Sequence, residues 1–123
     1  MWTYLRTTGE LRHDGTLVGH GYSGHGDGLN DPAMEGVPDI GPIPAGAWTI
    51  GAPLDPPDHL GPLAMPLTPA PHTNTFGRSA FFMHGDNAAG DQSASHGCII
   101  MNRLIREAVH TAAQAGDNTL SVL

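Results

Sequence analysis

The chain of 123 residues contains no lysine, one cysteine and no apolar run long enough to cross a membrane. Its five basic residues are all arginines, and twelve acidic residues give a formal charge of −7. This balance argues against binding to nucleic acid or to an anionic membrane surface. A single cysteine excludes an internal disulfide framework. The first residues also lack the basic-then-apolar pattern of a secretion signal, so synthesis in the cytoplasm and export by another route are expected.

Glycine and proline are abundant, with 17 and 11 residues, and the prolines cluster between Pro32 and Pro71. This is too many for a helical bundle and indicates long ordered loops around a β core. The length fits a single domain over residues 1–123, and neither an internal repeat nor a domain boundary is visible.

Alternating and continuous apolar segments predict a mainly β domain with one C-terminal helix. Strands are expected within residues 1–7, 11–13, 16–18, 47–50, 63–67, 79–83, 98–101 and 119–123. Residues 103–115 have apolar side chains at helical spacing, with Asn102 as the N-cap and Gly116 as the stop. Residues 19–28 are expected to form a flexible loop, and residues 52–75 a proline-rich surface excursion.

The only cysteine, Cys98, lies in the sequence Ser-His-Gly-Cys, fourteen residues after His84-Gly85. A thiol becomes a strong nucleophile when a neighbouring base removes its proton, and histidine is the usual base. The spacing allows one strand to end at His84, a loop to cross, and a second strand to begin at Cys98. A lone cysteine is more often a buried apolar residue, but this arrangement favours a cysteine acyl-transfer site.

The His-Gly pair followed by Ser-x-Gly-Cys resembles the signature of the L,D-transpeptidase catalytic domain. Further upstream segments resemble the small branch found among type VI secretion effectors, which attack the peptidoglycan of rival bacteria. These segments are Trp2-x-Tyr4, Gly21-Tyr22-Ser23-Gly24, Gly41-Pro42-Ile43-Pro44-x-Gly46, Phe76-Gly77-Arg78 and Phe82-x-His84-Gly85-Asp86. The resemblance covers residues 2 to about 106 and implies a single L,D-transpeptidase-like β-sandwich domain.

The resemblance also implies a thioester mechanism without a metal or cofactor. Cys98 would attack the carbonyl at the L-centre of diaminopimelate in a stem tetrapeptide and release D-alanine, with His84 as the base. The Gly85 carbonyl would hold the other ring nitrogen of His84. The backbone N–H groups of Gly97 and Cys98 would stabilise the oxyanion, and Gly97 would allow the substrate to approach closely. The group that attacks the thioester decides the activity. Water gives a carboxypeptidase and a free D-amino acid gives exchange, and these two outcomes are favoured. A second stem peptide would give a cross-link.

Several neighbours are candidates for substrate binding, each with a structural alternative. His96 orients the substrate or contributes only its backbone, while Ser95 contacts substrate or bonds the loop. Asp86 binds a substrate ammonium or caps the loop, with the loop role favoured. Tyr22 lines the cleft or belongs to the core, and Arg78 is a candidate for the substrate carboxylate.

One position departs from the resembled pattern, because Ile100 stands where many L,D-transpeptidases have arginine. Carboxylate binding at that position therefore does not carry over, and Arg78 or Arg103 would have to replace it. Arg103 and Arg106 are otherwise expected on the solvated face of a packing helix.

Other functions remain as alternatives. A zinc D,D-peptidase is suggested by Ser23-x-His25-x-x-Gly28, but the aspartate that this motif needs falls at Pro32. A papain-like hydrolase would place its histidine after the cysteine, where only His110 is available. A catalytically silent wall-binding or phage-structural module would not need both reactive side chains.

The expected partners follow from the resemblance. They are peptidoglycan stem peptides, an immunity protein that plugs the cleft around Cys98, and a component of the secretion apparatus. Action in the periplasm of a target cell is expected after delivery.

Overall fold

The computed structural model describes residues 1–56 and 59–123, and its main element is one nine-stranded sheet. The strands are β1 (Trp2–Leu5), β2 (Glu10–His13), β3 (Thr16–His20), β4 (Tyr22–Ser23), β5 (Gly46–Ile50), β6 (Met65–Pro69), β7 (Phe82–His84), β8 (Ile99–Ile100) and β9 (Thr119–Val122). One α-helix, α1 (Arg103–Gln114), precedes β9, and two short 3-10 turns lie at Gly26–Gly28 and Pro32–Met34. The prediction of a mainly β protein with one C-terminal helix is confirmed.

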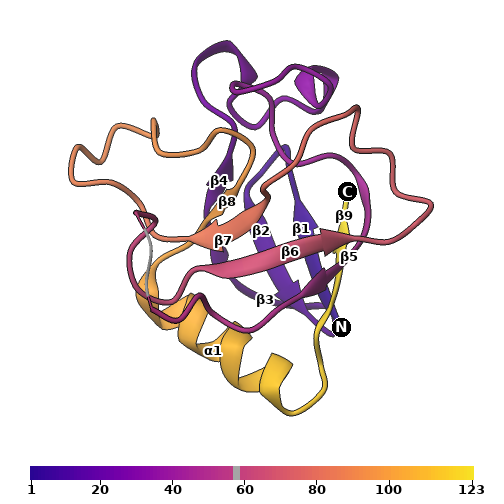
Figure 1. Ribbon diagram of the computed structural model, residues 1–123, viewed down its shortest axis with the longest axis vertical. Coiled ribbons are helices and arrows are strands. Elements are labelled where there is room, and N and C mark those ends of the chain that lie inside the picture. Colours follow the sequence, from indigo (N-terminus) through magenta and orange to yellow (C-terminus); the bar gives the residue numbers. More distant parts are fainter. Residues whose placement is uncertain (57–58) are drawn as a thin grey trace.

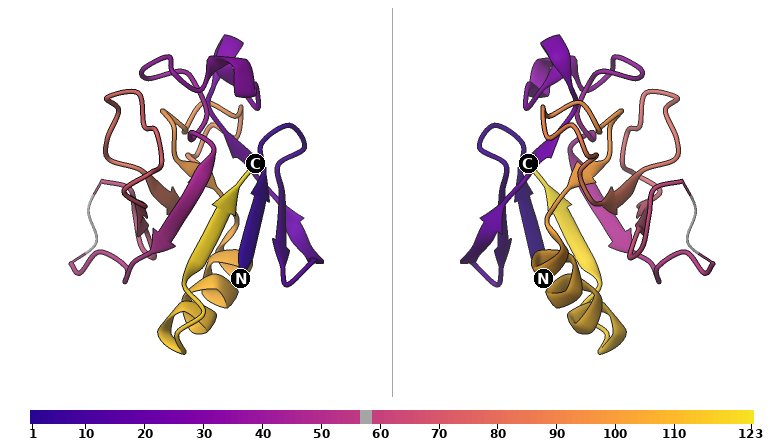
Figure 2. Two further views of the ribbon diagram at one scale, coloured as in Figure 1. Left: turned by 90° about the vertical axis from the view of Figure 1, so that its right-hand side faces the viewer. Right: turned by 90° about the vertical axis from the view of Figure 1, so that its left-hand side faces the viewer.

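The sheet curls until its two ends nearly meet (Figures 1 and 2). Its order is β3-β2-β1-β9-β5-β6-β7-β8-β4, and the end strands β3 and β4 are separated in sequence by Gly21 alone. The Gly21 N–H donates to the Gly9 carbonyl at 2.8 Å, and a Cβ at Gly21 would lie 1.9 Å from the Ile100 carbonyl oxygen. Only glycine fits where the chain crosses so close to a neighbouring backbone.

Strand β6 joins the two parts of the curled sheet, because its two ends have different partners. Residues 67–69 pair with β5, whereas Met65 and Pro66 pair with β7. The expected sandwich is therefore built by one sheet that turns over along β6. Residues 57–58 of the expected surface excursion lie outside the described residues.

The apolar core fills the inside of the curled sheet and extends to α1. It includes Trp2 and Trp48, as expected, and the fully buried Met83 and Ile99. The helix begins as predicted, with the Asn102 side chain accepting a hydrogen bond from the Ile105 N–H at 2.9 Å. In both figures α1 lies at one end of the sheet and long loops lie at the other. No helix in the described part of the chain is long and apolar enough to span a bilayer.

Two expectations about local structure were wrong. The segment 19–28 is not all loop, because β3 extends to His20 and Tyr22–Ser23 forms β4 against β8. The strand expected at 79–83 lies further along the chain, at Phe82–His84, and Ser79 and Ala80 are exposed. In both cases tertiary pairing, rather than local apolar content, decides where the strand lies.

Candidate active site

The register between β7 and β8 brings His84 and Cys98 to the same face of the sheet. The two strands are parallel, with Met83 paired with Ile99 and His84 with Ile100. Side chains alternate along a strand, so Met83 and Ile99 point into the core. Cys98 belongs to a separate apolar cluster with Phe82 and Ile100, whose side chains lie on the opposite face from Met83 and Ile99. His84 and Cys98 therefore lie diagonally across adjacent strands, about 8 Å apart between Cα atoms for ideal strand spacing.

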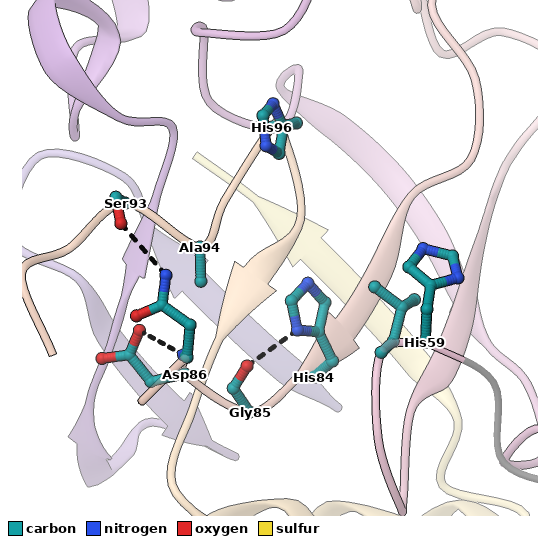
Figure 3. Close-up of a pocket in the computed structure, with 9 residues that line it drawn as sticks. His59, His84, Gly85, Asp86, Ser93, Ala94 and His96 are labelled. Carbon is teal, nitrogen blue, oxygen red and sulfur yellow. Dashed lines mark hydrogen bonds between the residues drawn. The ribbon is translucent and has the colours of Figure 1, made fainter. Parts of the chain in front are cut away.

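Both side chains line one cavity of about 200 Å³, whose other walls are His59, Leu60, Ala80, Phe82, Ala94 and His96. A second cavity of about 420 Å³ shares His84 and His96 and extends along Gly85, Asp86, Asn87 and Ser93. In Figure 3, the His84 imidazole stands between His59 and Ala94, with His96 beyond it. The two cavities share several lining residues, and we call them together the catalytic cleft after the role predicted for His84 and Cys98.

The His84 ring is held in one tautomer. Its Nδ1 lies 2.8 Å from the Gly85 carbonyl oxygen (Figure 3), and because a carbonyl can only accept, Nδ1 carries the proton. Nε2 is then the unprotonated nitrogen. Burial lowers the pKa of His84, and the nearby Arg106 and His59 lower it further, against the opposing effects of the Gly85 carbonyl and Asp86. The imidazole is consequently neutral and able to accept a proton.

Burial also favours the uncharged form of the Cys98 thiol. It is 8% exposed, and its Sγ lies 3.8 Å from the Ala80 carbonyl oxygen. Burial raises the pKa of Cys98 to about 11, although the Phe82 N–H and the charge of Arg78 act in the opposite direction. Both shifts favour a resting pair of thiol and neutral imidazole over a thiolate–imidazolium pair.

Ser95 and Gly97 hold the backbone before Cys98 in place. The Ser95 hydroxyl is fully buried; it accepts from the Gly24 N–H at 2.8 Å and donates to the Cys98 carbonyl at 2.6 Å. It also accepts from the Gly97 N–H at 3.2 Å. Of the two roles expected for Ser95, these bonds favour loop bonding over substrate contact. They also engage the Gly97 N–H, which was expected to be an oxyanion donor.

The backbone conformation and the packing at position 97 both favour glycine. Its φ is +126°, a conformation that side chains rarely adopt. A Cβ there would lie 2.5 Å from Arg78 Nη2. The position that a Cβ would take at residue 97 is therefore occupied by Arg78, and the role of Gly97 in substrate approach stays a prediction.

Arg78 itself bonds to the backbone. Its Nη1 donates to the carbonyls of Glu35 and Pro42 at 2.5 and 2.8 Å, and its Nη2 to those of Gly41 and His96 at 2.9 and 3.2 Å. These contacts occupy both terminal nitrogens, which favours a structural role over the substrate-carboxylate role expected from the sequence. Arg103, the other candidate, is half exposed and bonds Glu107 at 3.0 Å.

Tyr22 and Asp86 connect the two ends of the loop between β7 and β8. The Tyr22 hydroxyl donates to Asp86 Oδ1 at 2.6 Å and accepts from the Ala94 N–H at 3.1 Å. Burial and Asp86 raise the pKa of Tyr22 to about 12, so the phenol stays protonated. Tyr22 is buried outside the two cavities of the catalytic cleft, whereas Asp86 and His96 line them. The loop role proposed for Asp86 is consistent with this geometry.

Two residues of the site were missed in the sequence. His59 lines both cavities although it lies in the segment interpreted as a surface excursion. Arg106 was expected on a solvated face but is 7% exposed and lies against Gly85, so this expectation was wrong. Its guanidinium donates to the carbonyls of Met101, Pro62 and Leu63 at 3.0, 2.8 and 3.3 Å. The helical pattern placed Arg106 beside the buried Ile105, but only the fold supplies these acceptors.

The arrangement is compatible with acyl transfer by a cysteine and a histidine, and comparison with known proteins adds a family. A family model for the Tlde1 domain matches residues 18–122, which is most of the chain. The chain belongs to the Tlde1-domain family. Tlde1 proteins are type VI secretion effectors with antibacterial, peptidoglycan-directed enzymatic activity. No curated protein and no solved structure matches the chain.

The group of side chains that could hold a metal ion lies away from the catalytic cleft. Among the described residues, the metal-ligating side chains that gather in a group of three or more are His13, Asp14 and Asp117. None of them lines the catalytic cleft. His25 instead bonds the Ser95 carbonyl at 2.7 Å through Nδ1.

Proposed function

We propose that this Tlde1-domain protein is a cysteine-dependent L,D-carboxypeptidase and exchange enzyme acting on tetrapeptide stems of peptidoglycan. The observation that carries the proposal is the shared cavity: His84 and Cys98 line the same space, and Gly85 holds the imidazole with Nε2 unprotonated. A neutral base beside a protonated thiol is the arrangement required for nucleophilic attack assisted by general base catalysis.

The chemistry then proceeds in two steps. The sulfur of Cys98 bonds to the carbonyl carbon at the L-centre of diaminopimelate while Nε2 of His84 takes the thiol proton. Collapse of the tetrahedral intermediate breaks the bond to D-alanine, whose amine receives that proton from His84. Water or the amine of a free D-amino acid then attacks the thioester, and the Cys98 thiol is restored.

Neighbouring groups support the developing charges. The Phe82 N–H and the charge of Arg78 favour the thiolate form of Cys98. The Gly97 N–H already donates to Ser95. We therefore propose that the Cys98 N–H alone, of the two expected donors, stabilises the oxyanion. His96, at the cleft wall, is the proposed contact for the substrate backbone, and Asp86 the proposed contact for a substrate ammonium.

Mass spectrometry of purified protein incubated with disaccharide-tetrapeptide tests the proposal. We expect conversion to tripeptide, and exchange of the terminal residue when a D-amino acid is added. Cys98→Ala should abolish both products, while Arg12→Gln, which alters an arginine on β2, is the matched control. Absence of product and of a thioester adduct with the wild-type protein, or full turnover by Cys98→Ala, would refute the mechanism.

Effector biology adds a partner to the proposal. A producing cell whose own wall contains this bond would need an immunity protein, and the catalytic cleft is the surface whose coverage would block the reaction. Delivery by a type VI apparatus to the periplasm of a target cell follows from the family and needs no membrane-spanning segment.

A further inference from the structure

Two of the five arginines, Arg78 and Arg106, form no ion pair with a carboxylate among the described residues, and both lie beside glycines that adjoin His84 or Cys98. Arg6 pairs with Glu35 at 2.9 Å, Arg12 with Glu10 at 2.5 Å and Arg103 with Glu107 at 3.0 Å. Arg78 and Arg106 bond only to backbone carbonyls in the described part of the chain. Asp39 acts on Arg78 and Glu107 on Arg106 only at longer range. Burying a cation without a directly bonded counter-charge is costly, above all for Arg106, which is 7% exposed.

Each of the two guanidinium groups lies against a glycine that adjoins a reacting residue. A Cβ at Gly85 would lie 2.7 Å from Arg106 Nη2, and a Cβ at Gly97 would lie 2.5 Å from Arg78 Nη2. Gly85 also supplies the carbonyl that orients His84. Arg106 and Arg78 therefore determine where the backbone beside the base and beside the nucleophile can lie.

Each arginine also connects its glycine to a distant loop. Arg106 donates to the carbonyls of Pro62 and Leu63, a few residues after the His59 and Leu60 that line the cleft. Arg78 donates to carbonyls at residues 35, 41 and 42 and to that of His96, which lines the opposite wall. Arg106 thus holds the segment that follows one wall of the cleft, and Arg78 holds His96 on the other.

We propose that Arg78 and Arg106 are a matched pair of positioning residues, each of which fixes the backbone beside one reacting side chain and places near it a positive charge that forms no ion pair with a described carboxylate. Naming Cys98 and His84 as the reacting groups rests on the proposed function. The hydrogen bonds of the two arginines and their charges do not depend on that proposal.

The two charges act on the reacting groups in a complementary way. Arg106 opposes protonation of His84, and the groups that also face that imidazole are His59, Asp86 and the Gly85 carbonyl. Arg78 favours ionisation of Cys98, together with the Phe82 N–H. One cation therefore keeps the base free of its proton while the other helps the thiol to lose one.

Two titrations test the pair without requiring turnover. NMR of the His84 ring in the Cys98→Ala protein should give a His84 pKa that rises by about half a unit or more in Arg106→Gln. Arg106→Lys, which keeps the charge, should leave it near the wild-type value. In the protein with its thiol, Arg78→Gln should move the pH midpoint of Cys98 alkylation upward by a similar amount, and Arg78→Lys should not. Arg12→Gln removes the same charge elsewhere and should change neither midpoint.

Activity measurements separate positioning from charge. Because lysine cannot reproduce the several backbone bonds of arginine, both lysine variants should lose at least tenfold in kcat while their midpoints stay in place. If a glutamine variant does not fold, as judged by circular dichroism, the lysine variant of that arginine still tests its positioning role through kcat. Unchanged midpoints in folded glutamine variants, or full kcat in the lysine variants, would overturn the proposal. Shifted midpoints in a protein that cleaves no stem peptide would instead refute only the proposed function.

Discussion

The uncharged thiol leads to a quantitative prediction about the reactivity of Cys98. Burial raises its pKa from the ordinary 9.0 to about 11, which lowers the thiolate fraction at pH 7 by about 100-fold. The more basic thiolate is intrinsically more nucleophilic, and a Brønsted coefficient of about 0.4–0.5 recovers roughly 6- to 10-fold of this loss. Iodoacetamide should therefore modify Cys98 about 10- to 15-fold more slowly in the folded protein than in the same chain unfolded in denaturant at equal pH.

The same assay distinguishes the proposed resting state from an ion pair. If thiol and imidazole are both neutral, the alkylation rate should rise with pH up to the region of pH 11, or to the highest pH at which the protein stays folded. His84→Ala should then change the rate at pH 7 by less than about threefold, because the base does not ionise the resting thiol. A rate that is already constant from pH 6 upward, and that falls steeply in His84→Ala, would show a thiolate–imidazolium pair and refute this reasoning.

Three further predictions concern the surroundings of the pair. Gly97→Ala should destabilise the protein by about 1–3 kcal/mol in urea unfolding and abolish turnover, since it combines a positive φ with a contact to Arg78; a stable, active variant would contradict this. Tyr22→Phe removes two hydrogen bonds and should cost about 1–3 kcal/mol by the same assay, and an unchanged midpoint would argue against the loop role. In a pH profile of kcat/KM, activity needs neutral His84, whose pKa lies below its ordinary 6.5, so activity should be lost only as the pH falls through that lowered value; an acid limb above pH 7 would contradict the assignment.

The sequence predicted the elements and side chains whose signals are local. Asn102 at the helix start, the alternating strands and the apolar residues after Cys98 all reflect short-range patterns, and the structure has these elements. The separation of His84 and Cys98 likewise predicted two strands joined by a loop, and β7 and β8 are such a pair. The catalytic roles of both residues remain predictions for the assays above.

What the sequence did not reveal depends on contacts between distant segments. Strand β4 has two residues, too few for periodicity, and exists because β8 is available to pair with it. Arg106 is buried because the carbonyls of residues 62 and 63 lie within its reach, and no local pattern places them there. His59 enters the cleft through the same long loop. From sequence alone, side chains such as Arg106 and His59 are expected to be exposed to solvent, because their partners come from distant segments.

The geometry of the proposed pair depends on the register of β7 against β8 more than on any single loop. The side chains of successive residues on a strand point to opposite faces of the sheet. Met83 and Ile99 therefore pack in the core, while His84 and Cys98 line the cleft. A slip of β8 by one residue would turn Ile99 to the cleft and bury Cys98 in the core. That slip would expose one large apolar side chain and leave the core with a smaller one, at a cost of about 2 kcal/mol or more. The packing that stabilises the protein therefore also selects the register that places the thiol beside the imidazole.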